Sequence, residues 1–404
     1  MKRIFAGILS LSVLLCSCSN PEIITQDDLT SHNSTRQSDS ESAISQYEET
    51  QSSENNNNIK FSFDEYLQTV SSVVLLYEIS DSQVLICTER NGKYPVHIVD
   101  TKNAEQSEEI ICDIIPQCES NGFWTLMEND NENAMTISNF ISADTFSQAT
   151  IYNYNLEESE TISLLNGINA DGFDIDIESE QIAYSLTQLT DEETYTYRLN
   201  VTDFSFENTE TLYETPLAQA PVLAGMDTLH ICNDVIIFLG GYSSDLNAQS
   251  VRAYGSIAFD TFVPEYVYRA DSYGYALASY MNGAYIYECD YPFGVVSSGQ
   301  CIKIKDAHTN TITLQNTMES LNLYTSKNGK YFATAMTGNN QDGSVIIRIS
   351  VYSSDGGIVD TFDISFESEE MQSVASVYVF EENRTVYLKT QSAGGGDCWY
   401  EFLF

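Results

Sequence analysis

From Lys60 to Phe404 the chain alternates short apolar runs with polar turn residues, and it has little of the apolar spacing of amphipathic helices. The runs are rich in Val, Ile, Tyr and Phe, which favour strands. Strands are predicted over 72–79, 83–89, 181–187, 234–241, 284–289, 344–354 and 384–391. Hairpin turns are predicted at Asn91-Gly92, Asn282-Gly283, Asn328-Gly329 and Gly356-Gly357. The pattern predicts an all-β domain: a sandwich, a barrel or a propeller.

Internal repetition distinguishes these three architectures. A unit of apolar strand, tight polar turn and second apolar strand recurs, with the second strand beginning near Val84, Met135, Ile182, Val235, Tyr285, Tyr331 and Val386. The spacing averages about fifty residues, which is typical of four-stranded propeller blades. The clearest copy, SKNGKYFA from Ser326 to Ala333, resembles the turn-and-strand repeat of TolB-type and WD40-like propellers, although Lys327 stands where proline is common. The resemblance implies an architecture for residues 60–404 and transfers no functional residue.

The last unit is one strand short. After 384–391 the chain adds a single further strand, CWYEFLF, and the printed sequence ends. The segment 59–67, IKFSFDEYL, alternates apolar and polar residues and lies before the first full unit. We therefore predict seven four-stranded blades, with 59–67 as the missing strand that closes the ring between the N- and C-terminal segments.

The N-terminus has the pattern of a secretory signal: Lys2 and Arg3, then an apolar run from Ile4 to Leu15. The run ends in Leu15-Cys16-Ser17-Cys18, which resembles the bacterial lipobox. In that family a small residue precedes the acylated cysteine. The resemblance therefore implies a lipid on Cys18 and loss of Cys16 with the signal. The alternative is a soluble secreted protein with a stray cysteine pair.

Three segments follow from these patterns. Residues 1–17 are the predicted signal peptide, and residues 18–59 are the predicted lipidated cysteine with a polar tether. The tether is dominated by Ser, Asn, Gln, Thr, Asp and Glu, so it cannot bury enough apolar surface to fold. Residues 60–404 form the predicted propeller. The expected location is the cell membrane, lipid-anchored and facing outside the cytoplasm.

The charge is strongly negative, at −42 for the whole chain. Residues 61–404 hold 51 acidic and 13 basic side chains. The electric field of such an acidic surface repels nucleic acid and attracts cations or basic partners. The simpler interpretation of this charge is that the acidic residues keep an extracellular surface soluble. We expect no nucleic-acid partner, and a monomer.

Candidate functional residues fall into three sets. Asp174, Asp176 and Glu178 alternate along a strand and suggest a calcium site, the one cofactor that the sequence offers, although a solvated strand end explains them as well. Tyr291 and Phe293 lie in a tyrosine-rich loop and are the candidate residues for binding a partner. The pairs Cys289–Cys301 and Cys112–Cys118 are candidate disulfides, which persist outside the cytoplasm.

Enzyme signatures are missing from the sequence. His97, His230 and His308 have no adjacent Ser/Asp pattern, and there is no G-x-S-x-G elbow. We therefore expect a binding or scaffolding module for an envelope protein, a peptide or a glycan rather than an enzyme. The alternative is an extracellular carbohydrate-active hydrolase, since a pair of catalytic carboxylates leaves no sequence signature.

Overall fold

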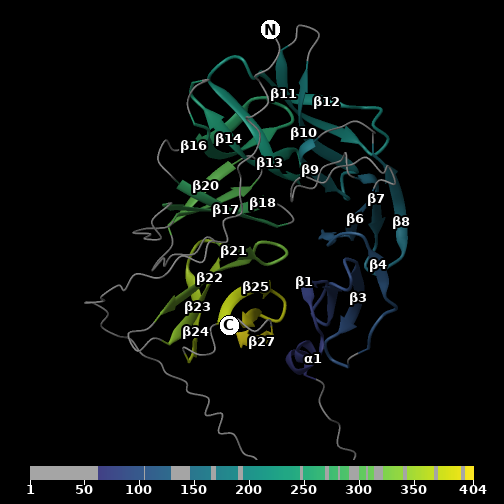
Figure 1. Ribbon diagram of the computed structural model, residues 1–404, viewed down its shortest axis with the longest axis vertical. Helices are drawn as coiled ribbons and strands as arrows, with labels where there is room; N and C mark the ends of the chain where they lie inside the picture. The colour runs from purple at the N-terminus through teal and green to yellow at the C-terminus, as the bar shows by residue number, and fades with distance from the viewer. Residues whose placement is uncertain are drawn as a thin grey trace, which may run out of the picture. The chain divides into compact units, whose positions relative to one another are not determined.

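The computed structural model describes residues 62–103, 105–128, 146–164, 170–189, 194–245, 249–268, 273–280, 283–290, 300–305, 308–313, 322–339, 344–367, 372–392 and 396–404. They belong to one compact unit, residues 59–404. Strands make up most of this part of the chain, and one short helix, α1 (Phe63–Thr69), precedes them (Figure 1).

The strands form seven sheets, six with four strands and one with three. The first two sheets are β1 (Val73–Glu78), β2 (Gln83–Thr88), β3 (Tyr94–Asp100) and β4 (Ile110–Cys112), then β5 (Gln117–Cys118), β6 (Phe123–Glu128), β7 (Phe146–Tyr152) and β8 (Glu158–Ser163). The third and fourth are β9 (Ala170–Asp176), β10 (Gln181–Leu189), β11 (Tyr195–Asp203) and β12 (Glu210–Pro216), then β13 (Val222–Cys232), β14 (Val235–Ser243), β15 (Val251–Ala258) and β16 (Pro264–Tyr268).

The remaining three sheets follow in the same order along the chain. They are β17 (Tyr273–Tyr280), β18 (Gly283–Asp290), β19 (Gln300–Lys305) and β20 (His308–Thr313); β21 (Asn322–Thr325), β22 (Tyr331–Asn339), β23 (Val345–Ser353) and β24 (Ile358–Phe366); and β25 (Gln372–Phe380), β26 (Thr385–Ser392) and β27 (Asp397–Leu403). Every strand pairs antiparallel with the next strand of its sheet. Each sheet is thus a local meander, as expected for a propeller blade.

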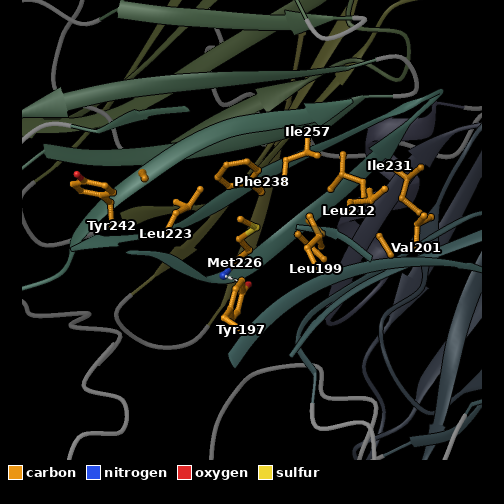
Figure 2. Close-up of a cluster of buried hydrophobic side chains, with 14 residues drawn as sticks. Tyr197, Leu199, Val201, Leu212, Leu223, Met226, Ile231, Phe238, Tyr242 and Ile257 are labelled. Carbon is orange, nitrogen blue, oxygen red and sulfur yellow. Dashed lines mark hydrogen bonds between the residues drawn. The ribbon is translucent and has the colours of Figure 1, made fainter. Parts of the chain in front are cut away.

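The hydrophobic cores lie between consecutive sheets. Figure 2 shows the core between the third and fourth sheets, where Tyr197 and Leu199 of β11 face Met226 of β13 and Phe238 of β14. The backbone N–H of Met226 donates to the buried Tyr197 hydroxyl at 2.6 Å. Because this phenol has a partner, its ring can be fully buried at little cost. A further cluster joins β25–β27 to β1–β3, so the last sheet packs against the first.

The strand predictions are confirmed at all seven predicted ranges, which overlap β1, β2, β10, β14, β18, β23 and β26. The second repeat unit is wrong by one strand. An anchor at Met135 makes 123–128 the first strand of this unit, whereas this segment is β6, the second strand of its sheet. Met135 itself lies outside the described residues. The first strand, β5, is only two residues long, too short to stand out as an apolar run.

The prediction of a closing strand over 59–67 is also wrong, because residues 63–69 form α1. Phe63 and Leu67 are buried one helical turn apart, and Asp64 and Glu65 lie in the first turn, where they favour a helix N-terminus. Ser62 at the N-cap and Glu65 three residues later match a capping sequence, but the Ser62 hydroxyl makes no capping hydrogen bond and donates to the Asp64 carboxylate instead. The last sheet therefore has three strands, and α1 contacts β27 (Figure 1).

The helix α1 packs on β27, the edge strand of the last sheet, and adds no strand to that sheet. The Gln68 side-chain amide donates to the Trp399 carbonyl of β27 at 2.7 Å. Phe63 packs edge-on against the ring of Tyr387, 5.5 Å between centroids. A side-chain donor and a buried ring thus occupy the place where a fourth strand was expected. In the part of the chain that the structure describes, no helix has the length and apolar character needed to cross a membrane.

Candidate functional site: the cavity between the first strands

A cavity of about 690 Å³ lies where the first strands of all seven sheets meet. Its lining comes from β1, β5, β9, β13, β17, β21 and β25 and from the turns that follow several of them. A shared cavity of this kind requires that the first strand of each sheet be innermost. The volume lies within the range of small-molecule and cofactor sites.

Hydrogen bonds connect neighbouring sheets at the ends of these strands. They are Tyr77 Oη to the Glu119 carbonyl (3.0 Å), Ile177 N to Glu119 Oε2 (2.9 Å), Ile231 N to Asp174 Oδ2 (2.8 Å), His230 Nε2 to the Tyr280 carbonyl (2.9 Å), Tyr285 Oη to the Gly329 carbonyl (2.6 Å), Asn328 N to Glu381 Oε2 (3.3 Å) and Glu381 N to Glu78 Oε2 (2.8 Å). The bonds join each sheet to the next, and the seventh to the first. Four of the seven use a carboxylate as acceptor for a backbone N–H of a neighbouring sheet.

Two of these carboxylates lie between the last and first sheets. Glu78 is 2 % exposed and accepts from the backbone N–H groups of Glu381 and Glu382. Burial raises the pKa of Glu78, and the backbone donors act against that rise. Lys327 lies nearby: its Nζ donates to the Ile79 carbonyl at 2.7 Å, and its charge lowers the pKa of Glu78. This part of the cavity therefore holds a cation supplied by the chain itself.

A second group, Glu119, Asp174 and His230, joins the second, third and fourth sheets. His230 Nδ1 lies 3.6 Å from Asp174 Oδ2, and its Nε2 donates to the Tyr280 carbonyl. Burial acts to lower the pKa of His230, but the Asp174 carboxylate and the carbonyl outweigh it and raise the pKa. For Glu119, burial and then the nearby Asp174 charge raise the pKa to about 9. Glu119 is thus protonated at neutral pH.

The three predicted calcium ligands do not converge on a common point. Asp174 is bound by the Ile231 N–H, and Asp176 accepts from the Glu178 N–H and the Ser179 hydroxyl of its own turn. Asp176 and Glu178 line the cavity. Among the residues that the structure describes, no group of three or more His, Cys, Asp or Glu side chains is arranged to hold a metal ion. The geometry therefore gives the calcium prediction no support.

The other predicted site residues do not belong to the group of Glu119, Asp174 and His230. Cys112 and Cys118 are free thiols in the structure, so no bridge joins them. Cys289 and Cys301 lie on the paired strands β18 and β19, but their side chains are outside the described part. Tyr291 and Phe293 lie outside the described residues, as does Cys18. The predictions made for these last three residues stay predictions.

Sequence reasoning missed Glu119 and His230. They lie 111 positions apart in the chain and come together only because the first strands are innermost. One signal was available for both: each lies at the end of the first strand of a repeat unit, beside the turn that precedes the second strand. Asp174 occupies the corresponding part of its own unit.

No family model matches the chain, and no curated protein resembles it at the level of sequence. Among solved structures, the acylaminoacyl peptidase of Pyrococcus horikoshii is similar at a TM-score of 0.50 and 8 % identity, over 85 % of this chain. This chain covers 53 % of the peptidase, about half its length.

Two further similar structures have lower TM-scores. The β-propeller domain of the Trilobed protease from Pyrococcus furiosus has a TM-score of 0.47 at 9 % identity, over 82 % of this chain and 95 % of that domain. The oligogalacturonate lyase from Vibrio parahaemolyticus has a TM-score of 0.48 at 10 % identity, over 80 % of this chain and 87 % of the lyase.

Likeness at such low identity concerns the fold alone. The likeness to the peptidase agrees with the seven antiparallel meanders. The chain is an all-β protein with a β-propeller fold.

Proposed function

We propose that this chain is a lipid-anchored, extracytoplasmic β-propeller of seven blades that acts as a binding module, and that its ligand enters the cavity between the first strands. The observation that carries the binding role is the cavity itself, about 690 Å³ with an acidic and apolar lining. Ligand sites combine concave apolar walls with a few convergent polar groups, as this lining does. The partner classes are an envelope protein, a peptide or a glycan.

The anchoring part of the proposal rests on the N-terminal sequence, with Cys18 as the acylated residue. Replacing Cys18 with Ala should abolish incorporation of radiolabelled fatty acid and release the protein from the membrane fraction. Replacing Cys16 should change neither, because the signal peptide carries Cys16 away. Equal loss of label in both variants would contradict the assignment.

A second candidate function is hydrolysis of carbohydrate. The favouring observation is the pair formed by Glu119, whose pKa is raised to about 9, and the neighbouring Asp174 carboxyl group. Glycosidases use a pair of carboxyl groups, one of which donates a proton. However, both carboxylates already accept backbone N–H groups of adjacent sheets. We therefore place the binding role first.

One experiment separates the two candidates. The full-length chain is incubated with an array of immobilised peptides and glycans, and both retained protein and released fragments are measured. A binding module is retained on a subset of probes without fragment release. Release of glycan fragments that Glu119→Gln abolishes would establish the hydrolase instead, and neither retention nor release would reject both.

A further inference from the structure

The cavity is divided into two parts with different charge balance. In the part formed by the sixth, seventh and first sheets, the Lys327 ammonium lies beside Glu78. In the part formed by the second, third and fourth sheets, the lining contains Glu119, Asp176, Glu178 and Asp234. Within the described lining, the only basic group on that side is the His230 imidazole, and it is already engaged by Asp174.

Lys327 shows how this cavity holds an alkylammonium group. Its Nζ reaches from the sixth sheet to the Ile79 carbonyl beyond β1, and it lies close enough to Glu78 to lower the pKa of that carboxyl. A carbonyl acceptor with a nearby carboxylate is therefore sufficient to seat a lysine side chain here. The opposite part offers more carboxylates and has no such internal cation among its described residues.

One buried polar atom in the part of the cavity formed by the second, third and fourth sheets lacks a hydrogen-bond partner among the residues described. Gln181 lines the cavity, and its buried Oε1 has no hydrogen-bond donor. Buried polar groups of this kind are normally satisfied, so an unpaired acceptor in a cavity wall is a place for a ligand donor.

The spread of the carboxylates argues for an organic cation rather than a metal ion. The acidic side chains come from three different sheets, and no three metal-ligating groups converge among the residues described. Leu75, Leu323 and Val377, from the first, sixth and seventh sheets, add apolar surface to another part of the same cavity. Long basic side chains bury their methylenes and keep the head group in a polar place, so a cavity with both kinds of surface suits them.

We propose that the part of the cavity formed by the second, third and fourth sheets binds the cationic side chain of a basic peptide, lysine or arginine. This inference rests on the proposed binding function and specifies its ligand. The carboxylates of Asp176, Glu178 and Asp234 supply the charge, and Gln181 Oε1 accepts a hydrogen bond from the ligand.

The test uses isothermal titration of the full-length chain with two short blocked peptides, acetyl-Gly-Lys-Gly-amide and its norleucine analogue. The two differ in charge but share the aliphatic stem. The lysine peptide should bind at least about tenfold more tightly, and the difference should shrink at high salt. Equal affinity for the two peptides would overturn the proposal.

A pair of matched variants locates the site. Glu178 and Asp234 are exposed and line the cavity, so the double variant Glu178→Gln, Asp234→Asn should fold normally and bind the lysine peptide about tenfold more weakly. The control, Glu160→Gln with Glu210→Gln, removes two charges from exposed positions on the outer strands β8 and β12. It should leave the affinity unchanged. Equal weakening by both pairs would show a general field effect and reject the site.

Failure of this inference is distinguishable from failure of the binding function. If neither peptide binds while an uncharged glycan or peptide on the array does, the cation site is rejected and the binding module stands. If a cation-bearing probe binds but the double variant is unaffected, the ligand lies elsewhere on the surface, and the proposed site is likewise rejected.

Discussion

The backbone N–H of Glu381, at the end of β25, donates to Glu78 Oε2, at the end of β1, over 2.8 Å. The two residues are 303 positions apart, and the bond joins the last sheet to the first. Glu78 accepts a second bond from the N–H of Glu382 at 3.1 Å. A single buried carboxylate thus binds two backbone donors of the neighbouring sheet, where a shared strand had been expected.

The first prediction concerns this carboxylate. Glu78→Ala leaves the buried N–H of Glu381 and the part-buried N–H of Glu382 without their acceptor, and a fully buried unsatisfied group costs about 1–3 kcal/mol. The free energy of unfolding, measured by urea denaturation, should fall by about 2–4 kcal/mol. Glu78→Gln keeps one carbonyl oxygen as acceptor and should lose less. If the Ala and Gln variants unfold at the same urea concentration as the parent, Glu78 does not join the two sheets.

The second prediction concerns α1. Leu67 is fully buried between the helix and the last and first sheets. Leu67→Ala should lower the free energy of unfolding by about 2–5 kcal/mol, through lost burial and the cavity left behind. Glu65→Ala, at an exposed position of the same helix, is the control and should change stability by less than about 1 kcal/mol. Similar small effects of both substitutions would show that α1 does not stabilise the sheets.

The third prediction compares two glycines with positive φ. Gly329 (φ +65°) would place a Cβ within 2.7 Å of the Tyr280 ring, whereas Gly92 (φ +72°) has open space around it. Gly92→Ala therefore costs only the backbone conformation, about 1 kcal/mol. Gly329→Ala adds a clash between adjacent sheets and should lower the melting temperature clearly more than Gly92→Ala. Equal shifts would mean that the fifth and sixth sheets do not approach as closely as described.

The fourth prediction is a pH dependence due to Glu119. The folded-state pKa of about 9 lies above the ordinary value of 4.5, so between these values only the folded state holds the proton. The stabilising contribution is complete below 4.5 and is lost as the pH rises through about 9. His230, whose pKa is also raised, changes stability in the same direction.

Glu119→Gln keeps an acceptor for the Ile177 N–H and removes the titration. Urea unfolding at about pH 5 and about pH 8 should show a smaller loss of stability with rising pH in the variant, by on the order of 1–3 kcal/mol. Glu160→Gln, at an exposed position on β8, is the control and should behave like the parent. An unchanged pH profile in Glu119→Gln would contradict the protonated carboxyl.

The fold was largely predictable because strand periodicity and turn chemistry are local. The φ-positive Asn91-Gly92 turn lies between β2 and β3, as its sequence predicted. The failure at α1 has a non-local cause. Residues 63–67 carry both a strand alternation and a helical spacing, and packing of Phe63 and Leu67 against Tyr387 and Trp399 selects the helix.

The site was less predictable because its members come from different repeats. Asp174 was singled out as a metal ligand, whereas its partner is the Ile231 N–H of the next sheet. Glu119 and His230 carried no motif at all. A carboxylate that accepts a backbone N–H from another sheet is a relationship between two chain segments, so it becomes visible only when the sheets are placed side by side.

The central claim is that ligand occupies the cavity between the first strands. Ser279 lies on β17 and lines that cavity, so Ser279→Trp should fill it, while Ser163→Trp places the same ring at an exposed position on the outer strand β8. The deciding measurement is the affinity of both variants for the probe that the parent chain binds most tightly. At least about tenfold weaker binding by Ser279→Trp, with parental binding by Ser163→Trp, is the predicted result. Parental affinity in Ser279→Trp would contradict the claim.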